Sequence, residues 1–102
     1  MDKTIAKTIL EQLGGNRFIA MTGSKNFIAL ENGLLFQVGS GAKCGDKTVN
    51  RVRIILTPMD TYVVEVIYVR GVDFKVVEVV ADVYCDNLQR VFTRLTGFHT
   101  RL

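Results

Sequence analysis

Few residues in this chain of 102 could carry out covalent chemistry. The sequence holds two cysteines, Cys44 and Cys85, and one histidine, His99. A nucleophilic cysteine needs an adjacent base, but the last predicted helix separates Cys85 from His99 by ~20 Å at 1.5 Å per residue. Metal sites need clustered Cys, His or carboxylate ligands, and neither cysteine has a partner at ligand spacing. We therefore expect two free thiols, no metal and no cofactor.

Paired carboxylates are the remaining enzymatic option. Glu65 and Glu78 could face each other across neighbouring predicted strands, and Asp60 is a further acid. Because Arg70 and Lys75 are close in sequence, a solvated ladder of charges on the wet face of a sheet is the favoured interpretation. The sequence thus predicts a protein that is not an enzyme, with an unrecognised enzyme as an alternative.

The segment 39–48, GSGAKCGDKT, is the longest polar, glycine-rich stretch. A phosphate-binding loop needs the pattern G-x-x-x-x-G-K-[ST] between a strand and a helix, so that free backbone N–H groups face the phosphate. Here Asp46 separates Gly45 from Lys47, and the sequence that follows predicts a strand. We expect an exposed hairpin loop rather than a nucleotide site.

The basic residues make a better case for function. Arg51 and Arg53 share one face of a predicted strand, and Arg90 and Arg94 share one face of a predicted helix. Like charges four residues apart on a helix disfavour each other, and an anionic partner would relieve this. Arginine suits phosphate because its planar fork gives two parallel hydrogen bonds. The predicted binding residues for nucleic acid or another partner are Asn16, Arg17, Lys25, Asn26, Arg51, Arg53, Arg90 and Arg94, with a solvated surface as the alternative for the arginines.

Aromatic side chains could add a stacking surface for single-stranded nucleic acid. Tyr62 and Tyr68 lie on one face of a predicted strand, with Val64 and Val66 between them. That stripe is more typical of a hydrophobic core than of a stacking platform.

Hydrophobic spacing predicts the elements that position these residues. A helix over 2–13 ends at Gly14 and Gly15, and a last helix from Asp82 or Tyr84 to about Thr96 stops at Gly97. The predicted strands between them cover 17–21, 27–30, 34–38, 49–57, 61–69 and 74–80. Asn32-Gly33 is a hairpin signal, Val76-Val77 indicates a bulge, and the tail 98–102 is expected to pack back onto the fold.

These elements predict one α+β domain over residues 1–102. An N-terminal helix precedes an antiparallel sheet of about six strands, a C-terminal helix follows, and both helices lie on one sheet face.

Composition narrows the class of protein. The net charge of +3 at pH 7 is compatible with nucleic acid without being evidence for it. Apolar residues make up 48% of the chain, which argues against disorder. The longest apolar run is far short of the ~20 residues of a membrane span, and no secretory leader opens the chain. We expect a cytoplasmic protein that does not engage a membrane.

The stretch 13–27, LGGNRFIAMTGSKNF, resembles one found in small proteins of about this length from bacteriophages and mobile elements. The resemblance continues at Val52-Arg53-Ile54 and in residues 84–97, where Val91-Phe92-Thr93 precedes Thr96-Gly97. It implies a bacterial host cytoplasm and transfers no catalytic or binding residue. It raises two roles, an accessory to phage DNA metabolism and an inhibitor of a host defence system.

The sequence therefore predicts a small binding protein that engages nucleic acid or a nucleic-acid-handling complex. The first alternative is a protein–protein inhibitor of a host defence system, similar to an anti-CRISPR protein, or a homo-oligomeric structural protein. An open sheet edge would offer a route to a homodimer or to a host or phage protein.

Overall fold

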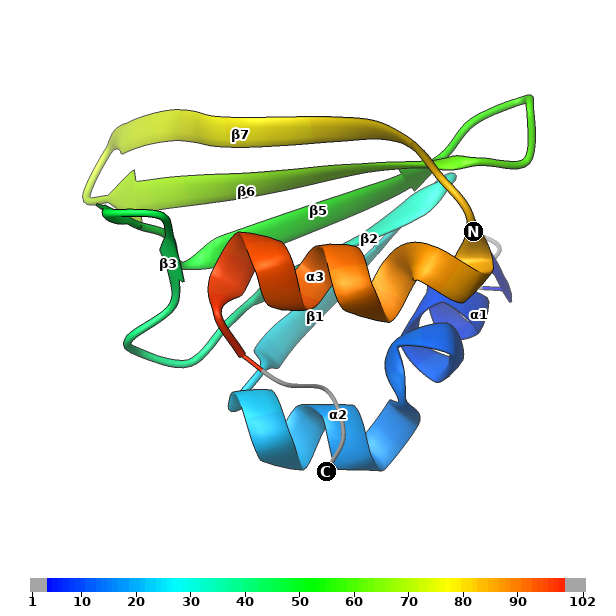
Figure 1. The fold of residues 1–102 in the computed structure, drawn as a ribbon, viewed down its shortest axis with the longest axis horizontal. Coiled ribbons are helices and arrows are strands. Elements are labelled where there is room, and N and C mark those ends of the chain that lie inside the picture. The colour runs from blue at the N-terminus through cyan, green and yellow to red at the C-terminus, as the bar shows by residue number, and fades with distance from the viewer. Residues whose placement is uncertain (1–3, 99–102) are drawn as a thin grey trace.

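The fold is α+β, with one layer of helices against one antiparallel sheet (Figure 1). The structure is a computed structural model that describes residues 4–98. Its helices are α1 (Thr4–Leu13), α2 (Gly15–Thr22), the short 3-10 helix η1 (Cys85–Asn87) and α3 (Leu88–Thr96). Its strands are β1 (Lys25–Leu30), β2 (Gly33–Gln37), β3 (Lys43–Cys44), β4 (Lys47–Thr48), β5 (Arg51–Leu56), β6 (Tyr62–Arg70) and β7 (Asp73–Val83).

The main sheet has five strands in the order β1-β2-β5-β6-β7, and β3 and β4 form a separate hairpin. Every neighbouring pair in the main sheet is antiparallel. Consecutive strands of the main sheet therefore lie side by side, so turns between them alternate between two ends of the sheet. The predicted sheet of about six strands is confirmed as antiparallel, with five strands in the main sheet.

A bulge interrupts β7 where the sequence predicted one. Val66 lies opposite Glu78, but the next residue, Ile67, lies opposite Val76, so Val77 is the extra residue. The register shifts again between Tyr62 and Val64, near Asp82, whose φ is 58°. Bulges increase the local twist of a sheet, and β7 curves at its end, where the chain passes into η1 and the start of α3 (Figure 1).

The core lies between the helices and the face of the sheet that they cover, here called the inner face. Phe18 of α2, Phe36 of β2 and Phe92 of α3 are all at most 1% exposed. The ring centroids of Phe18 and Phe92 are 5.0 Å apart, and those of Phe18 and Phe36 are 5.7 Å apart, both in edge-to-face geometry. Such aromatic pairs add to the burial free energy of their rings, so the three rings join α2 and α3 to the sheet.

The strand predicted over 17–21 is wrong, because these residues belong to helix α2. Gly14 and Gly15, with φ of 128° and 61°, turn the chain at the end of α1 and let a second helix begin. Phe18 and Thr22 are then buried four residues apart, as one face of a helix requires. A short apolar run does not distinguish a buried strand from a buried helix, and packing against Phe92 decides for the helix.

The other predicted elements are largely confirmed. The first helix begins at Thr4 within the described residues, and the predicted start at Asp2 lies outside them. The last helix is preceded by η1 and ends at Gly97, whose φ is 79°. The predicted packing of the tail concerns residues 99–102, which lie outside the described residues, and Phe98 contacts the core.

Two turns differ in detail from the sequence prediction. Leu30 lies opposite Gly33, so Glu31 and Asn32 form the β1–β2 turn and Gly33 is the first residue of β2. The segment 39–48 contains the β3–β4 hairpin. No helix within residues 4–98 has both the length and the apolar character that would let it span a membrane.

Candidate functional site

A pocket of about 330 Å³ opens between the β3–β4 hairpin and the β6–β7 pair. We call it the basic pocket, and its lining residues are Lys47, Thr48, Tyr68, Lys75 and Val77. Tyr68 and Lys75 lie directly opposite each other on β6 and β7. The bulge at Val77 places this residue in the pocket beside Lys75. The lining thus combines two ammonium groups, two hydroxyls and one aromatic ring.

The hairpin that forms one wall of the pocket is anchored by its buried flanks. Ala42 and Val49 are at most 1% exposed, and the Val49 N–H donates to the Ala42 carbonyl at 3.1 Å. Asn50 then fastens this segment to β6. Its side-chain amide donates to the Val69 carbonyl at 2.7 Å, and its side-chain carbonyl accepts from the Val69 N–H at 2.9 Å. Asn50 therefore holds the hairpin segment beside the strand that carries Tyr68.

The hairpin also contacts an acid of β7. The Cys44 thiol donates to Glu78 Oε2 over 3.6 Å. Burial raises the pKa of the Cys44 thiol, and the charge and hydrogen bond of Glu78 raise it further. The charges of Arg94 and Lys47 act in the opposite direction on the same pKa. The charge of Arg94 of α3 thus acts on Cys44 in strand β3 of the hairpin.

The sheet carries a charge gradient from end to end. One end holds the starts of β1, β5 and β7 and the ends of β2 and β6, and the β3–β4 hairpin and the last turn of α3 lie beside it (Figure 1). We call it the basic end, and its cationic residues are Lys25, Lys43, Lys47, Arg51, Arg70, Lys75 and Arg94. The acids there include Asp46, Asp73 and Glu78. The turns and strand ends at the opposite end carry Glu31, Asp60 and Asp82, and the helices there carry Asp86 in η1 and the oppositely charged Lys7 and Glu11 in α1.

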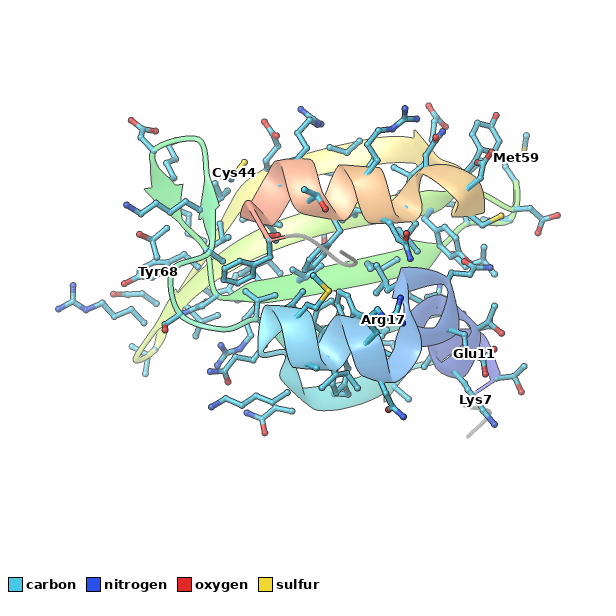
Figure 2. All side chains as sticks on the ribbon, turned by 60° about the horizontal axis from the view of Figure 1, so that its bottom comes forward. Lys7, Glu11, Arg17, Cys44, Met59 and Tyr68 are labelled. Carbon is cyan, nitrogen blue, oxygen red and sulfur yellow. The ribbon has the colours of Figure 1, made fainter. Side chains whose placement is uncertain are left out.

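Figure 2 shows the two ends of the molecule. Tyr68 and Cys44 lie at one end, whereas Met59, Glu11 and Lys7 lie at the other. A polyanion approaching the protein would meet positive charge at the Tyr68 end, and such charge asymmetry steers association.

The structure brings four of the predicted binding residues together on the face of the sheet that the helices leave open, here called the outer face. Lys25, Gln37 and Arg51 form one row across β1, β2 and β5. Asn26 Nδ2 donates to Gln37 Oε1 at 3.0 Å, which joins Asn26 to this row. Arg53 lies one outer position further along β5, where it forms an ion pair with Glu65. Arg53 is therefore already neutralised within the chain.

The other predicted binding residues are dispersed. Asn16 and Arg17 are exposed on α2, on the helix side of the molecule. Arg90 is exposed on α3 and donates to Asn87 Oδ1, and Arg94, one turn further on, acts on the hairpin through its charge. The eight predicted residues thus do not form one patch, and Lys25, Arg51 and Arg94 are those that belong to the basic end.

The predicted pairing of Glu65 with Glu78 is wrong. Glu65 lies opposite Val79, and Glu78 lies opposite Val66. Since residues that oppose each other point to the same face and successive residues alternate, Glu65 projects from the outer face and Glu78 from the inner face. Their partners, Arg53 and Cys44, lie on those two faces. The two carboxylates therefore do not act as a pair.

The two tyrosines on the inner face of β6 have different surroundings, since Tyr62 lies in the core and Tyr68 lies in the basic pocket. Tyr62 is 5% exposed, and its hydroxyl donates to Gln12 Oε1 at 2.7 Å, so it belongs to the core as expected. Burial is the main cause that raises the pKa of Tyr62. Tyr68 is half-buried and lines the basic pocket, which the sequence pattern did not indicate.

Sequence reasoning also missed Lys47 and Lys75 as binding candidates. Lys47 lies in the glycine-rich segment, which does not fit a phosphate-binding loop because a strand follows it. The positive charge of Lys47 nevertheless was a sequence signal for binding an anion. Within the described residues, no three His, Cys, Asp or Glu side chains cluster as metal ligands.

Comparison with known proteins gives no match: no family model fits the chain, and no curated protein or solved structure is significantly similar to it.

Proposed function

We propose that the protein is a non-catalytic binding module for nucleic acid, that the basic end is its contact surface and that single strands are its preferred ligand. The observation that carries this proposal is the basic pocket, where Lys47 and Lys75 flank the half-buried ring of Tyr68. Proteins that bind single strands combine positive charge along the backbone with aromatic rings on which bases stack. The pocket offers both within about 330 Å³, a volume in the range of small-ligand sites.

The surroundings of the pocket support an extended ligand. Lys43 belongs to strand β3 of the hairpin, the charge of Arg94 acts on Cys44 of the same strand, and Arg70 ends the same strand as Tyr68. A strand of nucleic acid carries one phosphate per nucleotide, so several of these cations could each contact one phosphate. In phage proteins of the kind that the sequence resembles, such binding would serve DNA metabolism.

Fluorescence anisotropy with a labelled oligonucleotide of mixed sequence tests the proposal. The affinity should fall steeply between 50 and 200 mM salt, because phosphate contacts release counterions. In the double variant Lys47→Gln/Lys75→Gln the plot of log affinity against log salt should become shallower by about 1.4, from about 0.7 per phosphate contact in a single strand. The duplex of the same sequence should bind more weakly.

The matched control is Lys7→Gln/Arg90→Gln, which removes the same charge from exposed positions on α1 and α3. This variant should keep the wild-type salt slope, because its side chains lie away from the pocket. No binding at the lowest salt concentration would refute the proposal, and so would equal losses in the pocket and control variants.

A further inference from the structure

The outer face of the sheet changes character from one edge to the other at the basic end. Over β1, β2 and β5 it carries a polar row with two cations, Lys25 and Arg51. Over β6 and β7 it carries apolar side chains, namely Ile67, Val69, Phe74 and Val76. Phe74 is 59% exposed although it belongs to a strand of the main sheet. An exposed aromatic ring near cations is the combination that bases and phosphates of a single-stranded nucleic acid bind.

The two cations of this row are not neutralised inside the chain. Arg51 Nη1 donates to the uncharged carbonyl of Asn50 at 3.1 Å, and Lys25 is exposed at the start of β1. Among residues 4–98 the one salt bridge joins Arg53 to Glu65, at the next outer position along β5 and β6. The outer face therefore offers free positive charge at the basic end, which favours an anionic ligand.

The open edge of β7 connects this surface with the basic pocket, since β7 is the last strand of the main sheet. The backbone of Val69 faces β5, because its N–H donates to Asn50 Oδ1 and its carbonyl accepts from Asn50 Nδ2. Opposed residues of an antiparallel sheet alternate between hydrogen-bonded and non-hydrogen-bonded pairs. Phe74, which lies opposite Val69, therefore turns its own N–H and carbonyl toward the open edge. The next residue, Lys75, lines the pocket on the inner face.

We propose that a single-stranded nucleic acid bound in the basic pocket continues over the edge of β7 onto the outer face. There a second base stacks on Phe74, and the phosphates that follow contact Arg51 and Lys25. The backbone N–H of Phe74 donates to a phosphate at the edge, a kind of contact that is common in nucleic-acid complexes. This inference rests on the proposed function and extends its ligand to a segment of several nucleotides that wraps around the edge.

The spacing of the outer residues suits such a segment. Phe74 and Arg51 are separated by two strands across the sheet and by two residues along it. With about 4.8 Å between strands and about 3.3 Å per residue, their backbones lie roughly 12 Å apart. A few nucleotides cover that distance, which agrees with the site sizes of about 4–16 nucleotides of small domains that bind single strands.

Substitution of Phe74 tests the second stacking contact by anisotropy with an oligothymidine of about 16 nucleotides. Phe74→Ala should weaken binding by about 5- to 150-fold, the value of one stacked base. Phe74→Leu keeps apolar bulk without a ring and should lose about as much, whereas Phe74→Tyr should stay within about threefold of wild type. The matched control is Val79→Ala, which removes an exposed apolar side chain of the same strand and face beside Glu65. It should also stay within about threefold of wild type.

The phosphate contacts of the outer face are tested by salt dependence. Lys25→Gln/Arg51→Gln should make the plot of log affinity against log salt shallower by about 1.4, from about 0.7 per contact. Arg53→Gln/Glu65→Gln removes the neighbouring ion pair from the same face and should keep the wild-type slope. Equal slopes in wild type and Lys25→Gln/Arg51→Gln would overturn the outer path.

Photo-crosslinking locates the second base directly. The probe is the same oligothymidine with iodouracil in place of some thymines, which crosslinks to the aromatic rings that it stacks on. Trypsin cuts after Arg70 and Lys75, so Phe74 is recovered in peptide 71–75 and Tyr68 in peptide 54–70. Both peptides should carry an adduct in wild type, and only peptide 54–70 should carry one in Phe74→Leu.

The outcomes distinguish this inference from the proposed function. A wild-type protein that binds no oligonucleotide would refute both. Binding that Lys47→Gln/Lys75→Gln weakens but Phe74→Ala leaves unchanged would keep the proposed function and overturn the path over the β7 edge. A Phe74→Leu variant with wild-type affinity, or a peptide 71–75 without an adduct, would overturn it as well.

Discussion

Tyr68 and Lys75 lie directly opposite each other on β6 and β7, and both side chains line the basic pocket. Opposed residues of an antiparallel pair have Cβ atoms about 4.5–5.5 Å apart. A base stacked on the Tyr68 ring would therefore place its phosphate within reach of the Lys75 ammonium. The two residues should act together on one nucleotide.

Replacement of Tyr68 should separate stacking from hydrogen bonding. Tyr68→Ala should weaken binding of a single-stranded oligonucleotide by about 1–3 kcal/mol, the value of one base stacked on an aromatic ring. Tyr68→Phe keeps the ring and should remain within about threefold of wild type, since one tenfold step corresponds to about 1.4 kcal/mol. Anisotropy titrations at one salt concentration measure both. Equal losses in the two variants would assign the contribution to the hydroxyl group instead.

The reactivity of the Cys44 thiol should depend on the contact between Glu78 and the hairpin that forms one side of the basic pocket. Burial, followed by the charge and hydrogen bond of Glu78, raises the pKa of Cys44 above its ordinary value of 9.0. In a Cys85→Ser background, the alkylation rate by iodoacetamide should therefore reach half its maximum above about pH 9, because the thiolate is the nucleophile. Glu78→Gln should move that midpoint down toward the ordinary value, whereas Glu31→Gln should leave it unchanged.

The raised pKa of Cys44 also predicts how the stability of the folded protein changes with pH. A raised pKa means that folded Cys44 holds its proton more strongly than unfolded Cys44. The contribution to the free energy of unfolding is present in full below about pH 9 and is lost as the pH rises through the folded value. Wild-type protein should thus lose more stability than Cys44→Ser as the pH is raised above that point in urea unfolding. Parallel curves for the two proteins would contradict the shift.

Much of the sheet could be predicted from the sequence because its signals are local. The alternation of polar and apolar residues from Arg51 to Ile54 indicates which face of the sheet each side chain occupies. In β7, the two successive valines Val76 and Val77 interrupt such an alternation at the bulge. Helix α2 could not be predicted in this way. Its identity as a helix depends on Phe18 reaching Phe92 in the last helix, and no local pattern contains that contact.

The candidate site was predictable only in part, for a similar reason. Lys47 and Lys75 lie far apart in sequence and meet because the hairpin folds beside the β6–β7 pair. Arg51 and Arg53 were assigned correctly to one strand face, but the pairing of Arg53 with Glu65 depends on register between strands. The number of charged residues in a sequence does not reveal which of them are neutralised by such ion pairs.

Phe18 should be the residue on which the position of α2 depends. Its side chain is fully buried against Phe36 and Phe92, so Phe18→Ala should destabilise the protein by about 3–5 kcal/mol. Met21 lies on the same helix but is only half-buried, and Met21→Ala should have a smaller effect. Urea unfolding followed by circular dichroism gives both values. A larger loss for Met21→Ala would mean that a different face of α2 is packed.

Gly33 should tolerate no side chain, for a reason other than turn geometry. An added Cβ would come within 2.2 Å of the Ile54 carbonyl oxygen and 2.7 Å of Ile55 Cδ1. That oxygen belongs to the backbone of the neighbouring strand β5 and moves only if the pairing of β2 with β5 is disturbed. Gly33→Ala should therefore destabilise the protein by about 3 kcal/mol, at the upper end of overpacking effects.

Two comparison variants separate close approach from backbone strain at Gly33. Gly45 has φ of 65° and open space around its Cβ position, so Gly45→Ala should lose only the ~1–2 kcal/mol of a left-handed residue. If Gly33 were required for a turn with positive φ, Gly33→Asn would be the better tolerated substitution, since asparagine accepts that conformation. Because Gly33 is the first residue of β2 and an added Cβ meets backbone, Gly33→Asn should destabilise at least as much as Gly33→Ala in urea unfolding.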